Sequence, residues 1–124
     1  MRAKLLFLVA IILPPAGAAA GATFDGAWSG HADGATRAAR ACNPIRYAIR
    51  VAGHHIDGVG VRVDRAGDGA MTRVFPIAGV IRKDGSVGLV IQRFAAAEAR
   101  VEGGRIVGLQ QDAECRYEFT WIHE

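Results

Sequence analysis

The strand-like segment at residues 115–122 constrains the fold more than any other part of the chain. One parity holds a thiol and three aromatic rings, and the other is polar until Ile122: Cys115, Tyr117, Phe119 and Trp121 alternate with Arg116, Glu118 and Thr120. Because successive side chains of a β-strand point to opposite faces of the sheet, this pattern predicts one buried face and one solvated face. The segment therefore predicts a strand whose aromatic row packs into a core.

The same period of two recurs between short turns along the rest of the chain. Residues 45–51 alternate as cleanly as the closing segment, and other strand-like runs cover 23–31, 56–63, 72–82, 87–94, 98–101 and 105–110. Asp84-Gly85 and Gly103-Gly104 lie between such runs and predict tight hairpin turns. About eight short strands without an amphipathic helix predict an all-β fold, a small antiparallel up-and-down barrel, with a β-sandwich as the alternative.

Two further features concern the middle of the chain. Residues 64–69 (DRAGDG) are polar and rich in glycine, which predicts a turn between the runs on either side. Pro76 lies inside the run at 72–82 and cannot donate a hydrogen bond to a neighbouring strand. We therefore expect an edge position or a bulge at Pro76.

The first 22 residues have the pattern of an export signal. Arg2 and Lys4 precede an apolar run at residues 5–13, which is too short for a bilayer span of about 20 residues. Small residues allow cleavage after Ala20 or Ala22, and we favour Ala22. The expected organisation is a signal peptide at 1–22 and a single domain at 23–124, periplasmic or secreted, with no membrane anchor after cleavage.

The charge of the chain gives little support to a nucleic-acid partner. The formal net charge is +3, but Arg2 and Lys4 belong to the predicted signal. The remaining chain carries 13 Lys and Arg against 12 Asp and Glu, a balance of +1. These basic residues are scattered, which favours a solvated strand surface over a nucleic-acid patch.

The two cysteines, Cys42 and Cys115, predict a disulfide, because an even number of cysteines in an exported chain usually forms one. The loop closed would be long, so the chain-entropy model gives a stabilisation of about 4 kcal/mol. The alternative is a pair of buried free thiols. A redox or metal role is disfavoured because the sequence has no Cys-x-x-Cys.

Gly26-Ala27-Trp28 in the first strand resembles the Gly-x-Trp signature of lipocalins, which avidin-type barrels also carry near their start. In those barrels the Trp packs at one end and an Arg from the last strand lies across it, a part that the resemblance assigns to Arg116. The second lipocalin turn motif has no counterpart here, and the biotin-binding set of avidins cannot be mapped. The chain is also similar in size, export and single disulfide to small periplasmic metalloprotease inhibitors, although their amino-terminal segment does not match residues 23–26.

The sequence contains no recognisable catalytic constellation, so we expect a protein that is not an enzyme and has no cofactor. Ser29 and Ser86 are its serines, and neither lies in Gly-x-Ser-x-Gly. A metal site could form from His54, His55 and Asp57, with His31 or His123 as a distant ligand. Adjacent strand residues point to opposite faces, so solvated turn histidines are the competing interpretation.

A ligand cavity is the remaining possibility, because an eight-stranded barrel is either filled by side chains or holds one small ligand. Tyr47, Tyr117, Trp121 and Trp28 would line such a cavity, or would simply form the core. The leading hypothesis is an exported, non-enzymatic module that binds a small apolar ligand or a protein partner. The alternatives are a periplasmic protease inhibitor and a metal-binding protein that uses His54 and His55.

Overall fold

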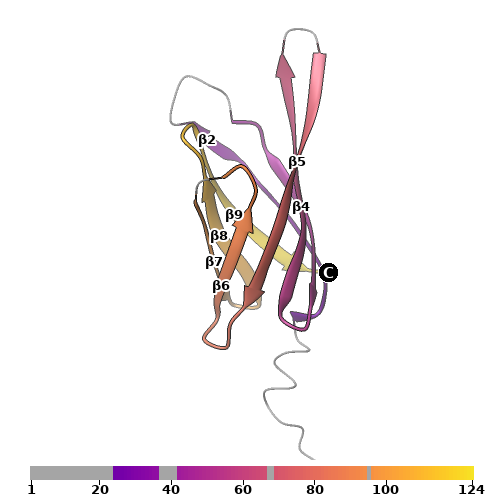
Figure 1. Cartoon of the computed structure of the whole chain (residues 1–124), viewed down its shortest axis with the longest axis vertical. Helices are drawn as coiled ribbons and strands as arrows, with labels where there is room; N and C mark the ends of the chain where they lie inside the picture. The colour runs from indigo at the N-terminus through magenta and orange to yellow at the C-terminus, as the bar shows by residue number, and fades with distance from the viewer. Residues whose placement is uncertain (1–23, 37–41, 67–68, 95) are drawn as a thin grey trace, which may run out of the picture.

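The computed structural model describes residues 24–36, 42–66, 69–94 and 96–124, so the predicted signal peptide at 1–22 lies outside the described residues. Nearly every described segment is a β-strand (Figure 1). The strands are β1 (Gly26–Ala32), β2 (Gly34–Thr36), β3 (Ile45–Ala52), β4 (His55–Ala66), β5 (Gly69–Ile81), β6 (Ser86–Ile91), β7 (Ala96–Glu102), β8 (Arg105–Gln111) and β9 (Cys115–His123). The all-β prediction is confirmed.

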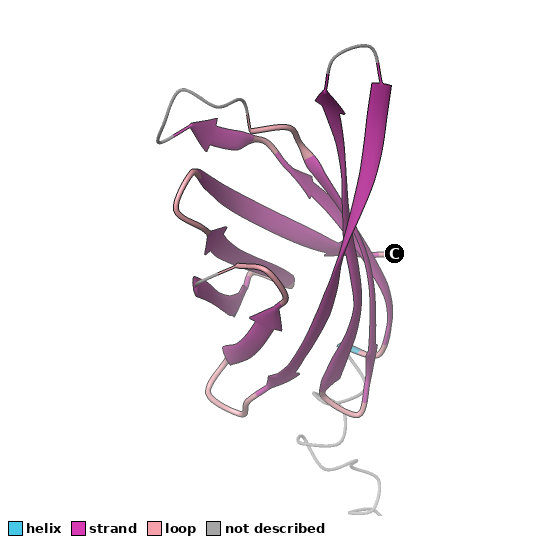
Figure 2. Ribbon diagram, turned by 45° about the horizontal axis from the view of Figure 1, so that its top comes forward, coloured by secondary structure: helices cyan, strands magenta, loops and turns pink. Residues whose placement is uncertain are grey.

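The sheet closes on itself to form a barrel (Figure 2). From β3 to β9 each strand pairs antiparallel with the next, and β1 pairs with both β3 and β9. β2 continues the register of β1 along β9, since Gly30 lies opposite Trp121 and Gly34 opposite Tyr117. β1 and β2 therefore act as one strand, and the molecule is an eight-stranded up-and-down barrel, as predicted.

The interior is filled by alternate side chains of every strand. β3 and β9 show the predicted alternation of buried and exposed residues. The buried apolar residues of the core are Trp28, Ala32, Ile45, Tyr47, Ile49, Val51, Ile56, Phe75, Ile77, Ile81, Val87, Ile91, Ile106, Cys115, Tyr117, Phe119 and Trp121. Burial of this apolar surface is the main force that stabilises the barrel.

β4 fills its inward positions in an unusual way. Gly58 and Gly60 face the core, where a Cβ on Gly58 would lie 2.9 Å from Ile49 and a Cβ on Gly60 would lie 3.1 Å from Ile45. The glycines thus leave room for the large side chains of β3. The valines of β4 consequently take the outward positions, the reverse of the arrangement on β3.

The hairpin of β4 and β5 is longer than the sequence predicts. The expected turn at 64–69 is wrong in its extent, because the two strands continue to pair up to Ala66 opposite Gly69. Asp64 lies within this paired region, and its carboxylate forms ion pairs with Arg62 and Arg73. The hairpin consequently projects beyond the other strands (Figure 1).

Pro76 lies at a local edge, as its chemistry requires. The N–H of Gln92 donates to the C=O of Pro76, so the backbone of Pro76 faces β6. The β5–β6 ladder ends at Ile77 opposite Ile91. The missing N–H of Pro76 therefore falls just beyond the end of the ladder.

The two ends of the barrel differ, and we call the end at Trp28 and His123 the closed end and the end at Cys115 the mouth. At the closed end, the His123 ring stacks on Trp28 with 4.5 Å between ring centroids. The Trp28 Nε1–H donates to the C=O of Phe24 at 2.8 Å. The expectation that Arg116 lies across Trp28 is wrong: Arg116 points outward near the mouth and pairs with Glu118, because the inward parity of β9 belongs to the odd residues.

Candidate functional site

The four predicted cavity-lining residues lie in the filled core. Tyr47, Tyr117, Trp121 and Trp28 are all buried. The Tyr47 ring lies 5.3 Å from Phe119 and 5.5 Å from Trp121, measured between centroids. Tyr47 and Trp121 therefore contact each other within the packed core.

A buried amide accompanies the aromatic rings. Gln110 has 0% exposure, and its Oε1 accepts a hydrogen bond of 2.5 Å from the Tyr47 hydroxyl. Burial, with a smaller effect of Tyr117, raises the pKa of Tyr47 above its ordinary value, so the hydroxyl stays protonated as this donor. The sequence reasoning missed Gln110, although it shares the inward parity of Ile106 on β8.

At the mouth, a charged network closes the space above the aromatic core. Arg62 is only 8% exposed, and its Nε and Nη2 donate to the two oxygens of Asp64 at 2.7 and 3.0 Å. Asp64 also accepts from Arg73 Nε at 3.0 Å and from Asn43 Nδ2 at 3.4 Å. The Arg62 guanidinium carbon lies 5.1 Å from the centre of the Phe75 ring, within cation–π range.

The network reaches the last strand through Tyr117. Arg62 Nη1 lies 3.5 Å from the Tyr117 hydroxyl, which donates to the C=O of Asn43 at 2.8 Å. Burial raises the pKa of Tyr117, although the hydrogen bond from Arg62 acts in the opposite direction. Burial would also raise the pKa of Asp64, but hydrogen bonds from Arg62, Asn43 and Arg73 outweigh it and hold that pKa below its ordinary value.

The predicted disulfide is confirmed and lies beside this network. Cys42 and Cys115 are bonded, with their Cα atoms 5.7 Å apart. The bond joins the segment before β3 to the start of β9, across 73 positions of sequence. Disulfides of this kind are typical of oxidising compartments.

The outer surface of β4 and β5 is apolar. We define the outer wall as the outward-facing residues Val59, Val61 and Val63 of β4, Val74, Pro76 and Ala78 of β5, and Val90 of β6. The register places Val59 opposite Pro76, Val61 opposite Val74, and Ala78 opposite Val90, so the seven residues form one contiguous patch. Val63, Val74 and Val90 are 46%, 49% and 66% exposed.

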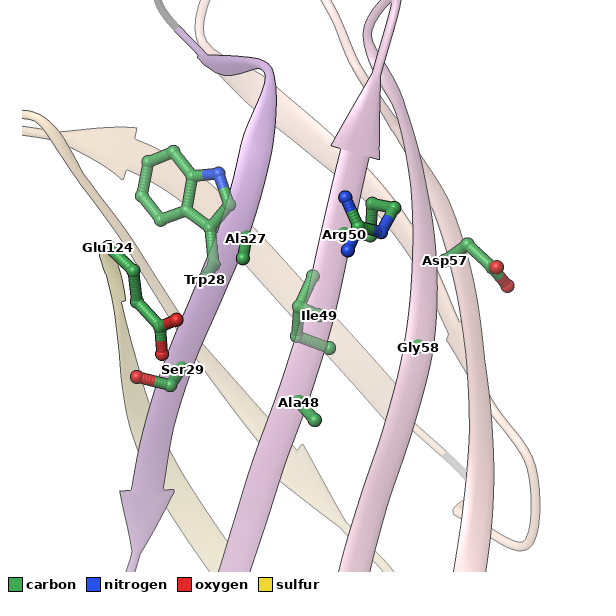
Figure 3. Close-up of a pocket in the computed structure, with 9 residues that line it drawn as sticks. All are labelled: Ala27, Trp28, Ser29, Ala48, Ile49, Arg50, Asp57, Gly58 and Glu124. Carbon is green, nitrogen blue, oxygen red and sulfur yellow. The ribbon is translucent and has the colours of Figure 1, made fainter.

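Two grooves adjoin the outer wall along β1 and β3. The first, of about 330 Å³, lies between Ser29 and Glu124 on one side and Arg50 and Asp57 on the other, with Ala48 between them (Figure 3). The second, of about 620 Å³, continues from Ser29 to His31, Asp33 and Arg46. Ser29 therefore lines a shallow outer groove, whereas Ser86 bonds to Asp84 in a hairpin turn.

The predicted metal ligands lie on the surface. His54 occupies the turn between β3 and β4 with a φ of 72°, and His55 and Asp57 are exposed at the start of β4. Within the described ranges, no three His, Cys, Asp or Glu side chains converge as a metal site would require. His31 and His123 lie elsewhere, on the outer face of β1 and against Trp28.

Comparison with protein-family models, with curated proteins and with solved structures finds no significant match in any of the three. The barrel architecture is thus established by the strand pairing alone. In the part of the chain that the structure describes, no helix has the length and hydropathy needed to cross a membrane.

Proposed function

We propose that this chain is an exported, non-enzymatic protein-interaction module, and that its outer wall is the surface that contacts the partner. One observation carries the proposal: β4 turns its valines outward while glycine and arginine occupy its inward positions. Large exposed apolar patches on soluble domains commonly mark interaction sites. The predicted signal peptide and the disulfide support an oxidising, extracytoplasmic location.

The wall has the anatomy of an interface. Its centre is formed by the β-branched side chains Val61 and Val74, which lie opposite each other. Its margins carry exposed arginines: Arg46 lies opposite Val61, and Arg65 opposite Ala70. An apolar centre with a charged rim is the usual arrangement at protein–protein contacts.

The charged residues at the margin of the outer wall bear on the surface charge expected of the partner. Arg46, Arg50 and Arg65 are exposed beside the wall, and Asp57, Glu124 and Asp33 are acidic residues that line the adjoining grooves. Electrostatic complementarity therefore favours a partner protein with an apolar patch bordered by acidic residues. In the grooves, Arg46 and Arg50 are the basic groups that acidic side chains of such a partner would contact.

The test compares two sets of substitutions that change the apolar surface but keep strand propensity. The wall variant is Val63→Thr/Val74→Thr/Val90→Thr, and the matched control is Val107→Thr/Leu109→Thr on the opposite side of the barrel. Mature wild-type protein, immobilised, is exposed to periplasmic extract, and the retained proteins are compared with those retained by each variant.

The proposal expects a partner that the wild type and the control retain saturably and that the wall variant does not. A photo-crosslinker at position 74 should join this partner, and one at position 107 should not. Retention of the same proteins by the wall variant, or no saturable retention by any form, would contradict the proposal.

A further inference from the structure

We propose that the mouth of the barrel also binds a compact oxyanion, a carboxylate or a phosphoryl group, between Arg73 and Arg93. This site is separate from the outer wall and does not depend on the function proposed for it. Its basis is a pocket of about 230 Å³ that three arginines share with an aromatic ring. The pocket is lined by Arg62, Arg73, Arg93, Phe75, Asp112, Glu114 and Cys115.

The acidic groups near the pocket matter first, because an unpaired carboxylate would repel an anion. Both oxygens of Asp64 are occupied, by Arg62, Arg73 and Asn43. Asp112 Oδ1 accepts the backbone N–H groups of Glu114 and Cys115, and so it shapes the turn before β9. Glu114 also lines the pocket and has a partner of its own.

The guanidinium groups of Arg73 and Arg93 are the hydrogen-bond donors of interest at the pocket. A guanidinium has five N–H groups. Arg73 uses its Nε on Asp64, and its side chain is 39% exposed. Arg93 forms no ion pair in the described part of the chain and is exposed. Arg73 and Arg93 therefore offer cationic donors at the pocket, which suits a ligand that accepts hydrogen bonds.

Two parts of the pocket lining are held in place by other contacts. Arg62 is held over Phe75 and bonded to Asp64, so one wall of the pocket is fixed before any ligand arrives. The disulfide fixes the opposite wall at Cys115. Preorganised guanidinium groups bind carboxylates and phosphates through paired, charge-assisted hydrogen bonds.

The backbone at Arg93 supplies an independent observation. Its φ is 75°, a left-handed conformation that costs energy for a residue with a Cβ. Glycine would adopt this φ without strain, so the turn itself does not call for arginine. The strain at Arg93 is explained if the side chain is needed where this conformation places it, at the pocket.

The experiment is a titration of isotope-labelled mature protein with inorganic phosphate and, separately, with acetate, followed by NMR at constant pH. The expected result is saturable shifts confined to the mouth, at the side-chain N–H signals of Arg73 and Arg93 and the backbone of residues 112–115. Tighter binding of phosphate would identify a phosphoryl group as the natural ligand chemistry, and tighter binding of acetate a carboxylate.

Two variants separate the site from general attraction of anions to arginine. Arg93→Gly removes the guanidinium and relieves the backbone strain, so it should fold at least as stably as the wild type and bind at least about tenfold more weakly. Arg105→Gln, at the opposite end of the barrel, is the matched control and should bind as the wild type does. Wild-type affinity in Arg93→Gly, shifts spread over the outer arginines as an adventitious ion would give, or no saturable shift would overturn the proposal.

Discussion

The two ends of the barrel close by different physical means. At the closed end, the strands are joined by short turns, and a histidine ring stacks on Trp28 over the bottom of the core. At the mouth, β2 ends at Thr36 and β3 begins only at Ile45, and an ion-pair network and a disulfide hold this end together. The closed end therefore depends on short turns and ring stacking, whereas the mouth has a covalent link to β9 and a polar network that runs from Arg62 on β4 to Tyr117 on β9.

The hairpin turns show why the closed end needs no covalent link. Gly103 and Gly104 have φ values of 60° and 78°, which match the two-residue turn whose twist suits a hairpin. Such a turn places its two strands in register with few ordered residues. At the mouth, the disulfide anchors the segment before β3 to the start of β9.

Trp28→Ala should give the largest effect, because it empties the centre of the closed end. Deleting a buried tryptophan side chain costs about 3–5 kcal/mol of unfolding free energy. Urea unfolding followed by circular dichroism measures the loss. Ile122→Ala, an exposed neighbour on β9, is the matched control, and an equal loss in both variants would show that Trp28 has no special role.

Removal of the disulfide should give the next largest effect and should act on the mouth. Cys42→Ala/Cys115→Ala opens a loop of 73 positions and so increases the conformational entropy of the unfolded chain. The expected loss of unfolding free energy is about 2–4 kcal/mol. Wild-type protein unfolded with and without reductant provides the control. Hydrogen exchange should increase first in residues 112–115, and a uniform increase across the barrel would contradict this assignment.

Asp64→Asn should destabilise the mouth by about 1–3 kcal/mol at neutral pH, because it leaves Arg62 without its charged acceptor. The pKa of Asp64 is lowered from 3.8 in the folded state, so its contribution is complete above that value and is lost as the pH falls through the folded pKa. The stability difference between wild type and variant should therefore shrink in acid. Urea unfolding at several pH values tests this, and a constant difference would show that the Asp64 charge is not involved.

His123→Ala should have the smallest effect, about 0.5–1.5 kcal/mol, because it removes one stacked ring from the closed end. The substitution exposes Trp28, so its fluorescence should shift to longer wavelength while the mouth stays unchanged. His123→Phe, which retains a ring, should restore most of the stability. If both variants behave alike, the stacking on Trp28 contributes nothing measurable.

The closed end and the alternating strands β3 and β9 were more predictable from sequence than the mouth. Strict alternation on β3 and β9 defines a buried face directly, and Asp84-Gly85 defines a hairpin from local preference alone. Arg62 could have been recognised, since it shares the parity of Ile56 and precedes Asp64 by two residues. Its partner Arg73, and the identity of the ring over Trp28, depend on strand register, which a single sequence does not specify.

The outer wall was the least predictable feature. The run Val59-Gly60-Val61-Arg62-Val63 alternates like any half-buried strand, so the pattern would place the valines inside. The structure reverses them because β3 already fills the core with Tyr47 and Ile49, against which only glycine fits. This conflict between local pattern and overall packing marks the outer wall as the place where the chain departs from a simple half-buried strand.

The pairing of β1 with β9 has a consequence for how the chain is made. The first strand of the barrel closes it against the last, since Trp28 lies opposite His123. Until β9 is complete, any sheet that forms retains two open edges, at β1 and at the newest strand, and open edges invite pairing with other chains. A chain that lacks β9 is therefore expected to associate with other chains through these edges rather than to form a smaller barrel.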